Sequence, residues 1–597
     1  MMKLEILKET DPIRGELAES MIALLAKKNL SGAFDEASIF QMLEKPPETH
    51  LGDYALPCFR FAKVMKRNPQ QIADDFRDEF ARENLNPWVE RIESKGAFLN
   101  FFIEKTLLAS HLLAKVQDGS YFKLPQTHAA FSKTRVMIEF SQPNTHKEFH
   151  VGHARNVCLG DSLCRIFGYL GYDVIAANYI GDEGTHVAKC LWQVVEQGGP
   201  PSDLNVNKAH WYGQNYVRAS KVLESADHEG KKTAMQKISS ILSQLESKNG
   251  PYYEVWKQSR EECLADFKNI YKWLDVHFDH YFFESELTEE AQKIVDEFIA
   301  KGLFSESDGA IGVDLSPYKL GFFMARKSDG TTPYITKDLV LARRKFDDFK
   351  VDRSLYVVGS EQNFHFEQLF KALELMGFPQ AKDCFHLSYA HVRLPEGKMS
   401  SRSGTMLPFA FLRDNLLKEL SPYLEKYQDQ WGESERNMTA DRLAVGAIKY
   451  GMLSSDPVKE IIFDLQAWTS FEGNTGPYLM YSYARTKSIL AKCAEKGFTA
   501  SLNHCDCLEQ ASARELLRYL YDFNDMVKQA CENYKPSTIA NHLYNMCKAY
   551  NRFYADVPIL KAPTSEERSA LIALLETFAK VLKQGLLLLG IDPPERM

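Results

Sequence analysis

The order of apolar and polar positions in the middle of the chain predicts a strand, a helix and a second strand. Residues 136–140 are almost continuously apolar, as expected for a parallel strand that is buried on both faces. After a loop, apolar side chains recur at helical spacing up to about residue 170, at Val157, Cys164, Phe167 and Leu170. Residues 173–178 form the next strand-like run, so the whole segment has the length of a βαβ unit.

The two ends of the chain carry different patterns. Residues 1–125 combine helical patterns with a strand-like run at 98–103, and a polar stretch at 118–133 marks a boundary. From about residue 443 onward the pattern is helical throughout, and we expect a separate domain at 451–597. These patterns predict an α+β N-terminal domain and an all-α C-terminal domain.

The middle of the chain, residues 126–450, is predicted to form a Rossmann-like parallel-sheet domain. Strand-like runs return at 355–358 and 386–392. Between the two halves of this domain, helical and charged sequence at about 190–325 interrupts the α/β pattern, and we interpret it as one insertion. The predicted fold class is therefore α/β with two flanking domains.

Composition is typical of an ordinary globular protein of several domains. The chain has 597 residues, 45% hydrophobic and 25% charged. A net charge of −8 argues against indiscriminate nucleic-acid binding, but local basic clusters can still contact a specific RNA. Such clusters are Arg60/Lys63/Lys66/Arg67 and Arg343/Arg344/Lys345, although solvated helix faces explain each equally well.

Cysteine usage and apolar runs bear on the compartment. The 11 cysteines include no Cys-x-x-Cys pair, which argues against a zinc ribbon, and scattered core thiols fit a reducing compartment. No signal peptide is indicated at the N-terminus, and the apolar run 586–591 is too short to span a bilayer. We expect a cytoplasmic protein without a membrane segment.

The string His150-Val151-Gly152-His153 follows the first predicted strand and opens the helix. Backbone N–H groups and the helix dipole favour an anion there. A metal pair is an alternative, with His146 or His186 as further ligands, but no metal-binding pattern supports it and we predict no metal site. The chain lacks G-x-G-x-x-G at this turn and G-x-x-x-x-G-K-[ST] throughout, which excludes the common dehydrogenase and P-loop nucleotide sites.

A second string, Lys398-Met399-Ser400-Ser401-Arg402, lies in a polar loop flanked by glycines. Lysine is a point-charge ligand for phosphate, and glycines permit a loop that closes over a nucleotide. Without the first string, a solvated basic turn would be the favoured interpretation of this segment.

Together and in this order, the two strings resemble the ATP-binding elements of class I aminoacyl-tRNA synthetases. The resemblance implies that ATP is bound by His150, Gly152, His153, Lys398, Met399 and Ser400. One position departs from the family pattern, because Ser401 stands where the second lysine of the loop is usual. We expect Lys147, three residues before His150, to supply the missing charge, so that His150, His153, Lys147 and Lys398 act in catalysis.

Further segments resemble arginyl-tRNA synthetases in particular. These are 139–155, 177–182, 328–338 and 362–366 in the sheet domain, 50–55 and 96–101 before it, and 476–485 and 589–597 after it. The resemblance implies that arginine is held by Glu139 and Asn144 at its amino and carboxyl end and by Tyr334, Asp338 and Gln362 at its guanidinium end. A guanidinium is best met by planar carboxylates. Glu139 also stands out because a carboxylate in an apolar strand is costly without a partner.

The implied activity is ATP-dependent attachment of arginine to tRNA(Arg) through arginyl-adenylate, with Mg²⁺ accompanying ATP. The N-terminal domain then contacts the D-loop corner of the tRNA, the C-terminal helices bind its anticodon, and the enzyme is a monomer. Tyr478, Tyr481 and Tyr483 can stack on bases or belong to the core. The alternatives are a class I synthetase for another amino acid such as cysteine, a catalytically silent RNA-binding paralogue, and a tRNA-independent amide ligase.

Overall fold

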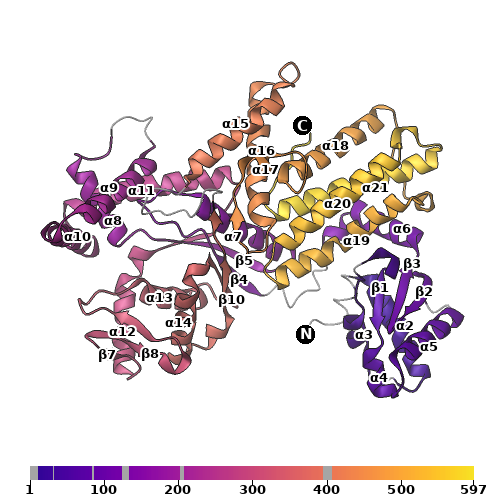
Figure 1. Cartoon of the computed structure of the whole chain (residues 1–597), viewed down its shortest axis with the longest axis horizontal. Helices are drawn as coiled ribbons and strands as arrows, with labels where there is room; N and C mark the ends of the chain where they lie inside the picture. The colour runs from indigo at the N-terminus through magenta and orange to yellow at the C-terminus, as the bar shows by residue number, and fades with distance from the viewer. Residues whose placement is uncertain are drawn as a thin grey trace.

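The computed structural model describes residues 8, 11–30, 32–46, 48–83, 86–123, 134–201, 207–393 and 407–597. The chain forms an N-terminal domain, a central sheet domain with helical additions, and a C-terminal bundle of long helices (Figure 1). No helix in these ranges is long and apolar enough to cross a membrane.

The N-terminal domain packs helices against a small antiparallel sheet of order β1-β3-β2. The strands are β1 (Tyr54–Pro57), β2 (Val89–Lys95) and β3 (Phe98–Ile103). The helices are α2 (Pro12–Lys27), α3 (Glu36–Met42), α4 (Phe59–Met65), α5 (Pro69–Glu83) and α6 (Lys105–Gln117). The predicted α+β character and the strand at 98–103 are confirmed.

The central sheet is parallel, with strand order β11-β10-β4-β5-β6. Its strands are β4 (Arg135–Glu139), β5 (Asp173–Ile180), β6 (His280–Phe283), β10 (Arg353–Gly359) and β11 (Cys384–Tyr389). Its helices are α7 (Val151–Tyr169), α8 (Thr185–Glu196), α13 (Tyr334–Asp347) and α14 (Asn363–Leu375). The chain runs from β4 toward β6 on one side and from β10 to β11 on the other. The sheet therefore has a topological switch point between β4 and β10, where α/β proteins bind ligands.

The prediction of one insertion at 190–325 is wrong, because β6 lies within that range and belongs to the central sheet. Residues 177–180 of β5 pair with residues 280–283 of β6. With only four residues, β6 has no distinct apolar run, and its pairing decides its place. The additions before β6 are α9 (Lys208–Ser225), α10 (His228–Glu246) and α11 (Pro251–Trp273). Those after it are α12 (Thr288–Ala300), β7 (Ser305–Ser307), β8 (Ala310–Asp314) and β9 (Phe322–Arg326).

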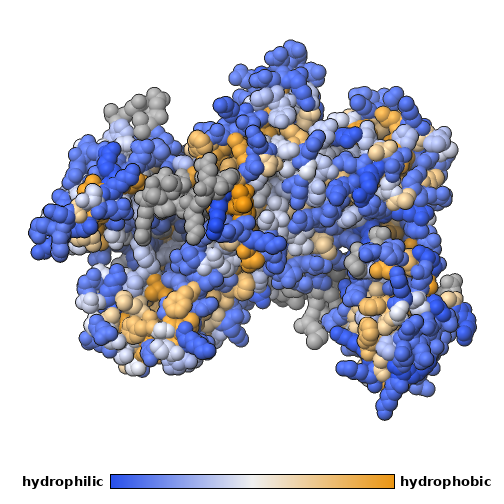
Figure 2. Space-filling model, viewed as in Figure 1, coloured by the Kyte–Doolittle hydropathy of each residue, from blue (hydrophilic) through white to orange (hydrophobic). Residues whose placement is uncertain are grey.

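The C-terminal part is helical except for one short pairing, in which β13 (Ile461–Ile462) runs parallel to β12 (Val392–Arg393). Its helices are α15 (Phe409–Glu425), α16 (Glu433–Leu453), α17 (Leu465–Thr469), α18 (Gly476–Glu495), α19 (Ala511–Glu532), α20 (Ser537–Asp556) and α21 (Ser565–Leu588). α16 crosses the boundary predicted at residue 450. The surface over α9 and α10, at the far end of the molecule from the N-terminal domain, is mostly hydrophilic (Figures 1 and 2).

Helix α7 joins the sheet to the helical bundle. Of its 19 residues, 13 are buried. Gly160 lets α7 approach β4, since a Cβ at this position would lie 2.0 Å from the ring of Phe140. On the opposite side, the Asp161 carboxylate lies 2.9 Å from Lys449 Nζ of α16, and Ser162 Oγ donates to the Leu588 carbonyl.

A polar cluster fixes the N-terminal domain to α19. Lys45 Nζ lies 2.5 Å from Asp522 and 2.6 Å from Asp525. Nearby, the hydroxyls of Tyr54 and Tyr521 donate to the Asp11 carboxylate. Burial alone would lower the pKa of Lys45, but the carboxylates of Asp522 and Asp525 outweigh burial and raise it.

We predict that Lys45→Met weakens the attachment of the N-terminal domain by on the order of 3 kcal/mol, because three carboxylates then share the interface without their cation. Urea unfolding with hydrogen exchange of the α19 amides measures this effect. Lys63→Met on exposed α4 is the matched control and should leave both readouts unchanged. Equal behaviour of the two variants would show that the cluster does not hold the domains together.

Candidate functional site

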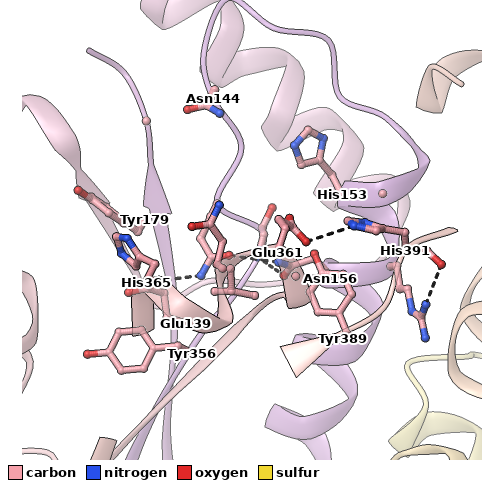
Figure 3. Close-up of a pocket in the computed structure, with 18 of the residues that line it drawn as sticks. Glu139, Asn144, His153, Asn156, Tyr179, Tyr356, Glu361, His365, Tyr389 and His391 are labelled. Atoms are coloured by element: carbon pink, nitrogen blue, oxygen red, sulfur yellow. Dashed lines mark hydrogen bonds and ion pairs between the residues drawn. The ribbon is translucent and has the colours of Figure 1, made fainter. Parts of the chain in front are cut away.

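A cavity of about 980 Å³ opens at the switch point, at the carboxyl ends of β4 and β10. All the predicted site residues that the structure describes line this cavity. They are Glu139, Asn144, Lys147, His150, Gly152, His153, Tyr334, Asp338 and Gln362. Lys398, Met399 and Ser400 lie outside the described residues. In Figure 3, Glu139, His365 and Tyr356 lie toward one end of the cavity and His153 and His391 toward the other.

The two histidines of the first string cap α7 reciprocally. His150 is the N-cap, and its Nδ1 accepts a hydrogen bond from the Gly152 N–H at 3.2 Å. The Nδ1 of His153 accepts from the His150 N–H at 3.2 Å, and the ring centroids stack 3.7 Å apart. These two amides are therefore already bonded. We expected backbone N–H groups to favour an anion at this helix start, and for the amides of His150 and Gly152 the structure contradicts this.

The capping fixes which ring nitrogen carries the proton. Burial, with a smaller contribution from Lys147, lowers the pKa of His150 to about 4. Burial also holds the pKa of His153 well below its ordinary value, and His150 and Lys147 add to this. Both rings are thus neutral near pH 7, and because each Nδ1 accepts a hydrogen bond, each proton lies on Nε2. The pair offers two Nε2–H donors without a formal charge.

Gly152 is needed by the cap itself. A Cβ at this position would lie 3.0 Å from His150 Nδ1. A side chain there would require the His150 ring to shift.

The other two histidines near this loop are engaged in hydrogen bonds. His146 lies between the hydroxyls of Thr145 and Ser259, at 2.9 and 2.8 Å. His186 Nε2 contacts the Gly181 carbonyl at 3.3 Å. Within the described residues no group of three histidine, cysteine or carboxylate side chains is arranged to hold a metal ion.

Glu139 at the end of β4 has an internal partner. Its Oε2 lies 2.6 Å from the fully buried Nζ of Lys345, and its Oε1 accepts from Gln142 Nε2 at 2.9 Å. The carboxylate in this apolar strand thus has the partner that its burial requires, because α13 brings Lys345 to it from across the fold. In the second basic cluster, Lys345 is buried, whereas Arg343 and Arg344 are partly exposed and pair with Glu297 and Glu290.

The opposite wall comes from α13 and the turn after β10. The Asp338 carboxylate uses one oxygen, Oδ2, to contact His365 Nε2 at 2.7 Å. The other oxygen of Asp338, Oδ1, does not take part in this contact. Tyr334 is the first residue of α13, and its hydroxyl packs against Gly184. A Cβ added at Gly184 would lie only 2.5 Å from this hydroxyl oxygen. Gln362 ends the short helical turn that follows β10. The cavity thus has a histidine-lined end and an end with carboxylate and hydroxyl groups.

Comparison with known proteins decides the family. Residues 118–465 match the model of the class I (R) tRNA synthetase catalytic domain, residues 14–103 the arginyl-tRNA synthetase N-terminal domain, and residues 479–597 the DALR anticodon-binding domain. This chain belongs to the arginyl-tRNA synthetase family.

Individual members of the family resemble the chain over nearly its full length. An arginine–tRNA ligase of Bdellovibrio bacteriovorus is 40% identical over 568 residues, which cover 94% of this chain and 95% of the relative. One from Halothermothrix orenii is 34% identical over 94% of this chain and 96% of the relative. The arginyl-tRNA synthetase structure from Thermus thermophilus aligns with a TM-score of 0.80 at 26% identity, covering 98% of this chain and all of that one.

The structure adds Glu284 to the cavity of this family member, a residue that the sequence did not single out. It follows β6, and Lys337 Nζ contacts its carboxylate at 3.1 Å and that of Glu183 at 3.0 Å. Burial raises the pKa of Glu284 to about 8, although Lys337 opposes the rise. Glu284 lies directly after β6, and because this short strand was not recognised in the sequence, no local pattern singled the residue out.

Arg155 is the second residue that was missed. It is fully buried on α7, and burial lowers its pKa to about 10. Its guanidinium donates to backbone carbonyls on two segments, those of Ala390 and His391 before β12 and those of Asp456, Pro457 and Lys459 before β13. One side chain therefore ties the histidine-bearing helix to the segments that precede β12 and β13.

We predict that Arg155→Met increases hydrogen exchange at the backbone amides of residues 390–393 and 456–463, because these segments lose their shared donor. Arg155→Lys should restore part of the protection, since an ammonium reaches fewer carbonyls than a guanidinium. Unchanged exchange in the methionine variant would contradict the role of Arg155.

Proposed function

We propose that the chain attaches arginine to tRNA in two steps. A carboxylate oxygen of arginine attacks the α-phosphorus of ATP, which forms arginyl-adenylate and releases pyrophosphate. A hydroxyl of the terminal ribose of tRNA then attacks the acyl carbon and releases AMP. Family membership supports the reaction, and the observation that carries it is one cavity with paired neutral histidines at one end and carboxylates at the other.

The histidine end is suited to the phosphates. Charge builds on the phosphoryl oxygens as the α-phosphorus becomes five-coordinate, and preorganised donors stabilise that charge. In this proposal the Nε2–H groups of His150 and His153 donate to these oxygens and Lys147 supplies a positive charge. Lys398, Met399 and Ser400 remain predicted ATP ligands, as does Gly152 through the close approach that it permits.

The other end is suited to arginine. The Asp338 Oδ1, the Tyr334 hydroxyl and Gln362 are assigned to the guanidinium, with Glu284 as a further carboxylate beside it. Glu139 and Asn144 are assigned to the amino and carboxyl end. Since Lys345 already balances Glu139, the amino group of arginine would share that carboxylate with Lys345 and would not be its sole partner.

Mg²⁺ is assigned to the ATP phosphates, which usually hold this ion together with one or two carboxylates and water. The described cavity offers one suitable carboxylate in Glu361. Its side chain is 52% exposed, and its ion-pair contact is with His391 at 3.4 Å. Mg²⁺ supplies positive charge to the phosphates when it is bound.

The flanking domains are assigned to tRNA(Arg), the N-terminal domain to the D-loop corner and the C-terminal helices to the anticodon. Of the three tyrosines considered, Tyr483 is buried, and the Tyr478 hydroxyl accepts a hydrogen bond from Asn551. Tyr481 is 42% exposed and remains the candidate for base stacking. We further propose a monomer that works in the cytoplasm, where its free cysteines stay reduced.

We predict that Asp338→Asn raises the barrier for arginine by about 3–5 kcal/mol in kcat/KM, as for breaking a desolvated charge pair. Steady-state arginylation at varied arginine measures the loss. Asp347→Asn is the matched control, because it makes the same change at an exposed position of the same helix. Unchanged kinetics in Asp338→Asn would remove this residue from the site.

Two substitutions of His150 distinguish the capping role of its Nδ1 from the proposed donor role of its Nε2. Asparagine places an acceptor near Nδ1 and preserves the cap, whereas glutamine places a donor near Nε2 and loses about 1 kcal/mol of capping. We expect His150→Asn to keep the thermal midpoint but lower kcat by about 10²–10³-fold, the effect of losing one transition-state donor. His150→Gln should have a higher kcat than His150→Asn but a lower thermal midpoint. The reverse order would show that His150 acts only as a cap.

A further inference from the structure

Lys345 of α13 lies behind the wall of the cavity and contacts one of the residues that form it. Its side chain is fully buried, and its Nζ lies 2.6 Å from Oε2 of Glu139, whose side chain is 4% exposed. Glu139 lines the cavity, whereas Lys345 is not among the lining residues. Lys345 therefore reaches a ligand in the cavity through Glu139.

The contacts around this ion pair fix one orientation of the Glu139 carboxylate. Lys345 holds Oε2, and Gln142 Nε2 donates to Oε1 at 2.9 Å. The ring centroid of Tyr356 lies 3.6 Å from Lys345 Nζ, and Tyr356 is paired with Glu139 in the register of β10 and β4. Glu139 and Tyr356 lie at the same end of the cavity (Figure 3). The ammonium group is thus in contact with a carboxylate and an aromatic face, both from the sheet.

The other titratable side chains around the pair do not replace Lys345 as a counter-charge. Those from the neighbouring strands are Tyr179 of β5, Tyr356 of β10 and Cys384 of β11. Burial raises the pKa of Cys384 to about 11 and holds the pKa of both tyrosines well above its ordinary value, so all three groups are uncharged near pH 7. At the same end of the cavity, His365 contacts the carboxylate of Asp338. Lys345 is therefore the cation that balances Glu139.

A stable core alone does not require this pair. Burying two charges is costly, and an apolar pair of similar volume is often as stable or more stable. The neighbours of Lys345 on α13 follow the apolar rule, since Leu341, Ala342 and Phe346 all belong to the core. Without Lys345, desolvation would favour the protonated form of Glu139. The pair thus maintains a charge at the cavity wall that burial would otherwise remove.

We propose that Lys345 is a positioning residue for the amino group of arginine, which keeps the Glu139 carboxylate ionised and holds it at the cavity wall. This inference rests on the proposed assignment of Glu139 to the amino end of arginine. Glu139 then presents a negative charge to the α-ammonium group throughout the neutral range. The alternative is that the ion pair contributes only to the stability of the sheet.

The test measures Kd for arginine by titration calorimetry of the full chain between about pH 6 and about pH 8, where ordinary carboxylates stay ionised. The variants are Lys345→Met, Lys345→Gln and Lys345→Met/Glu139→Gln. Lys345→Gln keeps a hydrogen-bond donor without the charge and is measured in case the methionine variant does not fold. A second ligand is 5-guanidinopentanoic acid, which is arginine without its amino group.

Lys449→Met is the matched control. Lys449 is also fully buried and lies 2.9 Å from a carboxylate, that of Asp161, but this pair joins α16 to α7 and lines no part of the cavity. The control therefore removes a buried cation of the same kind without changing Glu139. The contact between Asp338 and His365 is present in the wild type and in every variant, so its effect cancels in ratios of Kd.

We expect the ratio of Kd for arginine in Lys345→Met to that in the wild type to rise as the pH falls. The rise should be about tenfold per pH unit while Glu139 holds a proton, because arginine binding must then release that proton. Lys345→Gln should behave in the same way. Lys345→Met/Glu139→Gln should bind arginine weakly at every pH, since glutamine cannot ionise. The amino-free ligand should bind all variants as it binds the wild type, and Lys449→Met should keep the wild-type Kd for arginine.

Three outcomes would overturn the inference. A Kd ratio of one at every pH would show that Lys345 does not act on arginine. An equal loss for the amino-free ligand, or the same loss in Lys449→Met, would leave only the stability of the fold. A pH-dependent ratio that persists in Lys345→Met/Glu139→Gln would assign the proton to another group. A wild type that binds arginine but charges no tRNA contradicts the proposed function and leaves this comparison intact.

Discussion

The structure depends on the burial of α7. This helix begins with the two capping histidines in the cavity, crosses beneath β4 at Gly160, and continues into contact with the C-terminal helices. A buried helix must have its polar groups satisfied, because unpaired polar atoms in the interior are costly. Asp161 meets Lys449, and Arg155 meets five carbonyls. These contacts fix the position of the histidines relative to both the sheet and the helical domain.

The same burial sets the chemistry of the site. Desolvation keeps His150 and His153 uncharged, and their capping bonds place both protons on Nε2. A neutral donor is well suited to an oxyanion that develops only in the transition state, since it does not bind the ground state as strongly as a full charge would. In the account proposed here, full positive charge comes from Lys147 and from residues of the second string.

Local pattern was enough to predict the βαβ unit and the helix start at His150, because both depend on residues close in sequence. The residues that line the cavity were instead implied by the resemblance to arginyl-tRNA synthetases. Pairing across the fold was not predictable. The four residues of β6 become a sheet strand only beside β5, and Glu139 finds Lys345 only because α13 packs behind β4. Arg155 was missed for the same reason, since its five acceptors lie more than 200 residues away in the chain.

The central claim is that this cavity activates arginine and no other amino acid for transfer to tRNA. The most direct measurement incubates the full chain with ATP, Mg²⁺, total tRNA and each of the twenty amino acids in turn, and follows acyl-tRNA and AMP. We expect arginine alone to accumulate on tRNA and one AMP to form for each arginine attached. Charging with a different amino acid, or AMP formation without acyl-tRNA, would contradict it.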